Sequence, residues 1–558
     1  MTHLIADQWW SDRVVYQIYP RSFADGNGDG VGDLAGIRER VDHLAWLGVG
    51  VVWFSPFFPS GGADSGYDIK DYRGVEARYG TLDEFDALID DLHRHDIKVV
   101  IDQVYNHTSD EHPWFADSVA GGERRDWYIW RPARSGAEPG APGAEPSELR
   151  SVFRGPAWTF HPDVGEYYLH LFHRKQPDLN WEVPEVRHAV YDTMRWWLDR
   201  GVDGFRLDVI NLISKPDDFM APGRRNPIAT VAHGPRLAEF LQEMRREIDA
   251  GRSARTLLIG ETPGVSAVEG ERLTSTETEA LDMLFQFEHM DVDRAATKWI
   301  ANVDGSVGRL SAVLDRWQTS LRSGWNSLYW SNHDQPRAVS RFGDDGEWRA
   351  RSAKTLGTVL HLLRGTPFVY QGEEIAMANV PFSGLDEIED VESTQFATEF
   401  LADGGSPDEL LDAIRHSSRD NARTPMQWDG TPEGTWAGGG SPLAIHPDHV
   451  DWNVADQRDD PTSVLHHYRW LIDLRRTDRV VAHGEYEPLL VGDDQVIAFG
   501  RRLGDDRRVV VANLSGDPAS FDATLIDGLT IEHADPERPD GTAGAGELEP
   551  WESRLYRS

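Results

Sequence analysis

Three acidic residues in the middle of the chain stand at the ends of short β-rich segments. They are Asp208, Glu261 and Asp334, and an Asn-His pair that ends at His107 follows an earlier segment of the same kind. If these segments are parallel strands of one barrel, their carboxyl ends meet on one face and the side chains share one mouth. A single acid at such a place is commonly a turn or helix N-cap residue. Three of them, in a chain without cysteine, favour a catalytic set.

Carboxyl groups in this arrangement can cleave a glycosidic bond with retention of configuration. That reaction needs two of them roughly 5–5.5 Å apart, one ionised to attack the sugar and one protonated to serve the leaving oxygen. Arg206 stands two residues before Asp208 and projects to the same side of its strand. We expect its guanidinium to keep Asp208 ionised, which favours Asp208 as the nucleophile.

A second oxygen-rich cluster near the N-terminus has the spacing of an EF-hand-like calcium loop. Oxygen donors recur at alternate positions, the fourth through its backbone carbonyl: Asp25, Asn27, Asp29, Val31 and Asp33. The twelfth position is Gly36 instead of the bidentate Glu of a true EF-hand, so the pattern indicates a single structural Ca2+ site. A turn rich in Asp and Gly that binds no metal would have the same composition.

Eight β-rich segments alternate with helix-patterned stretches, which predicts parallel βα units. The expected strands are Val14–Ile18, Val49–Phe54, Val99–Ile101, Gly204–Leu207, Thr256–Ile259, Met283–Phe287, Ser327–Trp330 and Pro367–Tyr370. Apolar residues at helical spacing lie between them, as at Leu82, Phe85, Ile89 and Leu92. We therefore expect an α/β protein whose first unit is a closed (β/α)8 TIM barrel.

The spacing of these units predicts further domains. The barrel is expected over residues 1–103 and 177–477, interrupted by an inserted domain at 104–176 and by a second insertion at about 378–441. After Thr477 helical periodicity disappears, and the segments Val496–Phe499 and Arg508–Leu514 flank a turn at Gly504-Asp505. This hairpin pattern predicts a C-terminal antiparallel β-sandwich over 478–558.

Composition excludes several classes of function. The 558 residues carry a formal net charge of −38, which disfavours nucleic acid and anionic membranes as partners. The absence of cysteine excludes disulfides, thiolate metal sites and cysteine nucleophiles. No run of about 18 apolar residues and no signal-like N-terminus is visible, so we expect no membrane span and a cytoplasmic location.

Four motifs at the ends of the expected strands resemble the α-amylase superfamily of glycoside hydrolases. They are VYNHT at 104–108, GFRLDV at 204–209, GET at 260–262 and SNHD at 331–334. The resemblance covers nearly the whole chain and is closest to the oligo-1,6-glucosidase, isomaltase and dextran-glucosidase branch. It implies Asp208 as nucleophile, Glu261 as acid/base and Asp334 as the acid that stabilises the transition state. It also implies that His107, Arg206 and His333 hydrogen-bond the sugar before the scissile bond, and that the N-terminal loop holds Ca2+ or Mg2+.

The same resemblance implies a pocket with a closed end. Asp64 is expected to fix the hydroxyls of the terminal glucose, and Tyr67 to be its stacking platform. Arg419 would pair with Asp64 and close the pocket, although Arg423 is near enough in sequence to be the alternative. A closed pocket admits only a terminal sugar, so we expect an exo-acting α-glucosidase on a small α-glucoside.

Several positions bear on the preferred linkage. The segment QPDLN at 176–180 resembles the oligo-1,6-glucosidase branch, and Phe172 and Gln176 would line the pocket wall. Val209, after the nucleophile, resembles enzymes that prefer α-1,6 links, with α-1,4 links or sucrose as the alternatives. Gln103 and Tyr105 depart from the aliphatic residues usual in this branch, which weakens the linkage prediction.

Two other functions fit parts of the pattern. A glucosyltransferase or isomerase, such as a sucrose isomerase, would share the covalent intermediate, but the Arg-Leu-Asp-Arg-Asp type of segment of sucrose isomerases is absent. A catalytically dead barrel, like the ectodomain of amino-acid transporter heavy subunits, would have lost the acids that this chain keeps. Relatives are often monomeric, so a monomer is expected.

Overall fold

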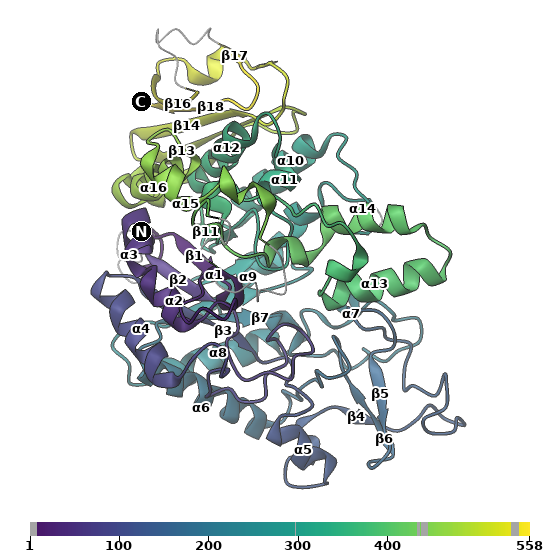
Figure 1. Ribbon diagram of the computed structural model, residues 1–558. Coiled ribbons are helices and arrows are strands. Elements are labelled where there is room, and N and C mark those ends of the chain that lie inside the picture. The colour runs from purple at the N-terminus through teal and green to yellow at the C-terminus, as the bar shows by residue number, and fades with distance from the viewer. Residues whose placement is uncertain (1–7, 296, 432–435, 437–444, 537–545) are drawn as a thin grey trace.

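The computed structural model describes all residues except 1–7, 296, 432–435, 437–444 and 537–545. Eight parallel strands form its central sheet: β1 (Val15–Ile18), β2 (Val51–Phe54), β3 (Lys98–Val104), β7 (Gly204–Asp208), β8 (Leu257–Glu261), β9 (Met283–Phe285), β10 (Ser327–Leu328) and β11 (Thr366–Tyr370). A parallel bridge between Leu284 and Asn326 joins β9 to the start of β10 and closes the ring. All eight expected strands are present and the barrel is confirmed (Figure 1).

The strands are mainly apolar because both of their faces are buried, and their charged residues lie chiefly toward the carboxyl ends, as Arg206 and Glu261 do. Inside the barrel, side chains such as Val51, Val100, Ile259 and Phe368 form one cluster. Outside it lie the helices α4 (Leu82–Arg94), α6 (Pro184–Asp199), α8 (Leu237–Asp249), α9 (Ala267–Thr274), α10 (Ser306–Ser320), α12 (Arg349–Leu362), α15 (Val454–Asp459) and α16 (Val464–Thr477). Short helices fill the loops: α1 (Pro20–Phe23), α2 (Leu34–Glu39), α3 (Val41–Leu47), α7 (Pro227–Val231) and α11 (Ala338–Phe342).

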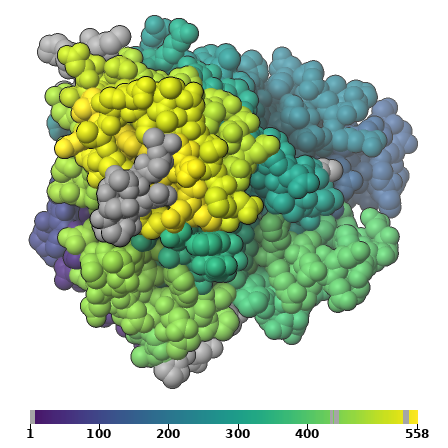
Figure 2. Space-filling model, turned by 90° about the horizontal axis from the view of Figure 1, so that it is seen from above, coloured from purple at the N-terminus to yellow at the C-terminus, as the bar shows by residue number. Residues whose placement is uncertain are grey.

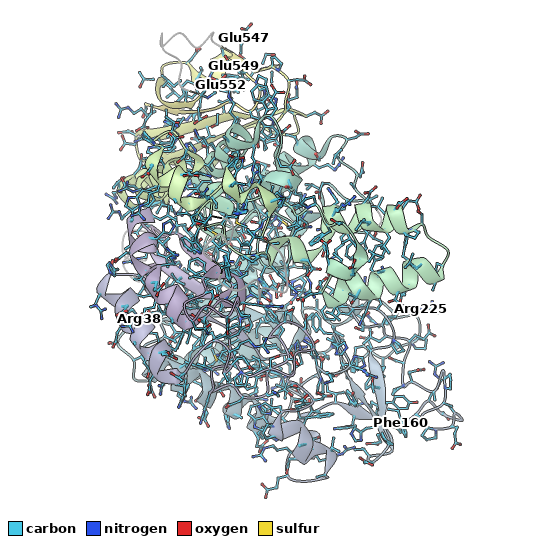
Figure 3. All side chains as sticks on the ribbon, in the orientation of Figure 1. Arg38, Phe160, Arg225, Glu547, Glu549 and Glu552 are labelled. Carbon is cyan, nitrogen blue, oxygen red and sulfur yellow. The ribbon has the colours of Figure 1, made fainter. Side chains whose placement is uncertain are left out.

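A small domain is inserted between β3 and α6. It contains α5 (Pro113–Val119) and an antiparallel sheet of β4 (Trp130–Arg131), β6 (Glu166–Leu169) and β5 (Trp158–His161). Trp158, Leu169 and neighbouring apolar residues of this domain form one core cluster with Leu212 and Phe219 of the segment after β7. Figure 3 shows the labelled Phe160 of β5 far from the C-terminal end of the molecule.

The second insertion is helical. Its helices α13 (Val391–Ala402) and α14 (Pro407–Ser417) form a pair beside the inserted domain (Figure 1). Glu399 of α13 forms an ion pair with Arg154 of the inserted domain, so the two insertions contact each other. The predicted end of this insertion, near Ser441, lies outside the described residues.

The C-terminal domain is antiparallel, as expected. Its main sheet has the order β12 (Glu485–Leu490), β13 (Val496–Leu503), β14 (Asp506–Asn513), β18 (Ser553–Arg557) and β16 (Thr530–Asp535), and β15 (Ala519–Ser520) pairs with β17 (Glu547–Leu548). The predicted hairpin is β13–β14. The short helix α17 (Arg479–His483) was not expected; Asp478 caps its N-terminus. Figure 2 shows this domain as a yellow block against the barrel. Within the described part of the chain, no helix could span a bilayer.

Candidate active site

Asp208 and Glu261 are the last residues of the adjacent strands β7 and β8. Arg206 lies between them, because residues two apart on a strand share a face. Its Nη1 donates to Asp208 Oδ1 at 2.8 Å, and its Nη2 lies 2.8 Å from Glu261 Oε2. The backbone N–H of Val209 also donates to Glu261 Oε2, at 3.0 Å. Two buried carboxyl groups therefore share the two ends of one guanidinium.

Asp102 is a third acid in this cluster and was not expected from the sequence. It lies on β3 in register with Arg206, whose Nη1 donates to its Oδ1 at 2.8 Å. Tyr67 Oη and Trp53 Nε1 donate to its other oxygen at 3.1 and 3.3 Å. A carboxylate at an inward position of a barrel strand is a signal that could have identified it, because such a charge needs a partner inside the barrel.

The charges in this cluster correct one expectation. Burial and the neighbouring Glu261 and Asp102 raise the pKa of Asp208, although Arg206 opposes this. Burial likewise raises the pKa of Asp102 to about 6. Arg206 contacts Asp208 as predicted, but it is shared with two other carboxyl groups and does not hold the pKa of Asp208 low. The cluster therefore retains a proton at a pH where an isolated aspartate has lost it.

Asp334 follows β10 and, unlike Asp208, lies among positively charged groups. Burial alone would raise its pKa, but the positive charges of Arg419 and Arg423 hold the pKa of Asp334 well below its usual range. Arg423 Nη2 lies 2.9 Å from Asp334 Oδ1, and Arg419 Nη1 lies 3.2 Å from the same atom. Asp334 is thus ionised throughout the neutral range.

The two histidines of the site are neutral. Burial lowers the pKa of His333 to about 3 and also lowers that of His107. The ring of His333 stacks on Tyr67 with centroids 5.3 Å apart, and its Nδ1 lies 2.7 Å from Gln17 Nε2. His107 Nε2 lies 3.1 Å from Gln176 Nε2. Neutral imidazoles can each donate one hydrogen bond and accept another.

The far end of the site is built around Asp64. Arg419 Nη2 lies 3.2 Å from Asp64 Oδ1, so Arg419 makes the contact expected from the sequence. Gln176 Nε2 donates to Asp64 Oδ2, also at 3.2 Å. The alternative, Arg423, instead donates to Ser65 Oγ at 3.1 Å. These contacts join the β2 loop, the inserted domain and the second insertion at one point.

Asp390 supports this closure and was not expected from the sequence. It caps the N-terminus of α13, is 1% exposed, and accepts from Arg419 Nε at 2.7 Å. Nothing in the sequence marks it, because 29 residues separate the partners.

The inserted domain supplies an aromatic wall. The ring of Phe172 lies 5.2 Å from that of His107 and 5.7 Å from that of Phe153. Gln103, by contrast, follows the inward-facing Asp102 on β3 and so faces the helices instead of the mouth. Its departure from the family pattern therefore has no direct bearing on the linkage.

The N-terminal loop contains the residues of the expected cation site. Asp25 accepts the N–H groups of Gly28 and Gly30 at 2.7 Å each, and Asp33 caps α2 by accepting from Gly36 at 2.7 Å. Burial raises the pKa of Asp33, and the charge of Asp25 adds to this. Asp33 Oδ1 accepts from both Gly26 and Gly36, whereas the two oxygens of Asp25 each accept one N–H and keep a second lone pair. Carboxylate and amide oxygens in one loop are the ligand type that Ca2+ and Mg2+ prefer.

Known proteins share this architecture. The family model "Alpha amylase, catalytic domain" matches residues 17–484. An oligo-1,6-glucosidase of Parageobacillus thermoglucosidasius is 44% identical over 98% of this chain and 99% of its own length. A trehalose-6-phosphate hydrolase structure from Bacillus licheniformis matches with a TM-score of 0.92 and 37% identity, over 98% of this chain and 99% of that one. An isomaltulose synthase structure from Klebsiella sp. LX3 matches with a TM-score of 0.90 and 35% identity, over the same two shares.

Proposed function

Because the chain belongs to the α-amylase family of glycoside hydrolases, we propose that it is a retaining exo-α-glucosidase. It would release terminal glucose from short α-linked oligosaccharides, with α-1,6 links preferred. The observation that carries this proposal is the Asp64–Arg419 pair at one end of a site that has Asp208 and Glu261 on one guanidinium. A closed end of this kind would admit the end of a chain but not its middle.

The reaction follows from the two carboxyl groups. Asp208 attacks the anomeric carbon, the glycosidic bond breaks, and the leaving oxygen takes the proton carried by Glu261. Water then gives a proton to Glu261 and attacks the same carbon, which frees Asp208. Two carboxyl groups on neighbouring nitrogens of Arg206 suit the roughly 5–5.5 Å spacing of retaining enzymes better than the roughly 6.5–9.5 Å of inverting ones.

The cluster around Arg206 also supplies the proton. The retaining mechanism requires this proton on Glu261 and the negative charge on Asp208 in the working form. Asp334, held ionised by Arg419 and Arg423, is suited to stabilise the positive charge that develops on the sugar ring.

The remaining residues would bind the terminal glucose. Asp64 and Gln176 offer acceptor and donor groups to its hydroxyls at the closed end. The neutral His107 and His333, with Arg206, would hydrogen-bond the sugar next to the bond that breaks. Tyr67 and Phe172 offer apolar surface, which sugar rings use for stacking.

The choice of substrate is tested by initial rates on isomaltose, maltose, sucrose, trehalose 6-phosphate and soluble starch, with the products followed by NMR. Fast release of α-glucose from isomaltose, with starch untouched, supports the proposal. Formation of isomeric disaccharides from sucrose would instead favour the transferase or isomerase alternative. The similarity to an isomaltulose synthase supports that alternative. Internal cleavage of starch would contradict the closed pocket.

We further propose that the loop from Asp25 to Asp33 binds a structural Ca2+, with Mg2+ as the alternative. Asp25, Asn27, Asp29 and Asp33 would supply side-chain oxygens and Val31 its carbonyl. Chelation should lower the melting temperature, and added Ca2+ should restore it. An unchanged melt after chelation, with no calcium detected by mass spectrometry, would identify a metal-free turn.

We also propose that the protein works as a monomer in the cytoplasm. All residues of the candidate site come from one chain, and a chain without cysteine gains nothing from an oxidising compartment. Light scattering should give a mass near 62.8 kDa; twice that value would contradict the monomer.

A further inference from the structure

A cavity of about 660 Å³ lies where the C-terminal domain meets the barrel. Its lining comes from α12, the α15–α16 region and β16, and none of it belongs to the candidate active site. Figure 1 places these elements at the end of the molecule opposite the inserted domain, and the glutamates labelled in Figure 3 mark the same end. The proposed reaction leaves this cavity without a role.

Three potential metal ligands converge on one side of the cavity. They are His467 of α16 and His533 and Asp535 of β16, and one ligand atom from each lies within 4.8 Å of the others. Two imidazole nitrogens and one carboxylate oxygen form a donor set that Zn2+ commonly uses, with water in the fourth position. Ca2+ and Mg2+ prefer oxygen ligands and fit this set less well.

Neighbouring side chains already hold each of the three residues. His467 Nε2 lies 2.9 Å from Thr358 Oγ1 on α12. The ring of His533 stacks on Trp470 with centroids 4.0 Å apart. Asp535 Oδ2 accepts from Lys354 Nζ at 3.0 Å, which leaves Oδ1 for an ion. Outer contacts of this kind orient the ligands of metal sites in proteins.

We propose that His467, His533 and Asp535 form a binding site for a divalent transition-metal ion of the Zn2+ type. The ion ties β16 of the C-terminal domain to α16 of the barrel, and the cavity provides the entry path and the space for a water ligand. Lys354 neutralises Asp535 when no ion is bound. Its positive charge also limits the affinity for a dication, so the site takes up the ion reversibly.

The test is calorimetric titration of the full-length protein with ZnCl2, in excess Ca2+ so that oxygen-ligand sites are saturated. We expect one Zn2+ per chain in this site. His533→Gln and Asp535→Asn should each weaken the binding at least tenfold. His466→Gln is the matched control, because His466 lines the same cavity but is not one of the three ligands.

Thermal unfolding gives an independent readout. Zn2+ at a hundredfold excess over its Kd should raise the Tm by about 2 °C in wild type and in His466→Gln, but not in His533→Gln. Unchanged hydrolysis of an α-glucoside checks that each variant is folded. The proposal is overturned if wild type binds no Zn2+, or if His533→Gln and Asp535→Asn bind it as tightly as wild type.

Discussion

At the scale of single residues, the cluster of Asp102, Asp208 and Glu261 around Arg206 determines the chemistry. Three buried acids and one cation cannot all be ionised at low cost, so a proton stays in the cluster. A retaining glycosidase needs such a proton on its acid/base and a free carboxylate on its nucleophile. Arg206 thus holds in place both of the adjacent acids that take these two roles.

The division of roles predicts the behaviour of two variants. Asp208→Ala should abolish turnover of every substrate, because no covalent intermediate can form. Glu261→Gln should slow isomaltose cleavage by roughly 10²- to 10⁴-fold but slow aryl glucosides with good leaving groups much less. Initial rates of each variant on isomaltose and on an aryl glucoside test this assignment of roles. An equal loss on both would count against Glu261 as the acid.

The pH profile provides a further prediction. Burial and the charges of Glu261 and Asp102 raise the pKa of Asp208. Because Glu261 carries the proton in the working form, the charge that can be removed there is that of Asp102, and its removal should lower the pKa of Asp208. In Asp102→Asn, assayed on an aryl glucoside, the acidic limb of the kcat/KM profile should therefore move to lower pH than in wild type. A limb that stays in place would show that the two carboxyl groups do not interact.

At the scale of elements, the site depends on segments that are distant in sequence. Asp390 at the start of α13 holds Arg419, and Arg419 in turn contacts both Asp64 and Asp334. A helix of the second insertion therefore determines the position of a charge at the closed end of the pocket. Asp390 acts through Arg419 and is a positioning residue.

Asp390→Asn should weaken the contact that holds the Arg419 guanidinium in position. We expect kcat/KM on isomaltose to fall roughly 10- to 100-fold, mainly through KM, because the closed end loses its alignment. Asp403→Asn, at the exposed C-terminal end of the same helix, is the control and should be silent. A similar loss in both variants, or a fall in kcat alone, would exclude a positioning role.

A second element-scale prediction concerns the turn after β11. Burial raises the pKa of Glu373 to about 8, and its oxygens accept from Ser331 Oγ at 2.7 Å and Tyr468 Oη at 3.1 Å. The folded state keeps this proton after the unfolded chain, with a pKa near 4.5, has lost it. Stability from this group is therefore present below about pH 4.5 and is lost as pH rises toward about 8.

Glu373→Gln removes this titration and keeps hydrogen-bonding groups in place. The variant should melt at a higher temperature than wild type at about pH 8.5, while the two should be similar at about pH 4.5. Melting curves at several pH values test this. A difference that does not change with pH would mean that Glu373 is already ionised in the folded protein.

The sequence predicted the elements better than the contacts between them. The eight strands and the β13–β14 hairpin follow from local patterns of apolar residues and turns, which the chain records directly. The motif residues Asp208, Glu261 and Asp334 were found because each follows a strand. Asp102 and Asp390 were missed because their partners are brought close only by the closed barrel and the folded insertion.

At the scale of the whole molecule, negative charge is in large excess. The formal net charge of −38 makes the folded chain repel itself more strongly than the expanded chain does. Ion pairs such as Arg154–Glu399, between the two insertions, offset this only locally. The net negative charge thus lowers the stability of the folded state, in which the barrel, the inserted domain and the C-terminal domain must stay in contact.

Moderate salt should therefore stabilise the protein. The Tm should rise between low ionic strength and about 0.15 M NaCl, because screening shortens the range of the repulsion to about 8 Å. KCl should have the same effect, since screening depends on ionic strength and not on the cation. A Tm that falls with either salt would mean that favourable ion pairs outweigh the net repulsion.

The sharing of Arg206 by Asp102, Asp208 and Glu261 also determines how the enzyme can be inhibited. The floor of the pocket has fewer positive than negative groups, so a sugar-shaped amine would bring the missing cation. Binding of such an amine would displace the shared proton, and by linkage its affinity should increase with pH until the amine itself loses its charge. The slope of that increase would report how many protons the three acids hold.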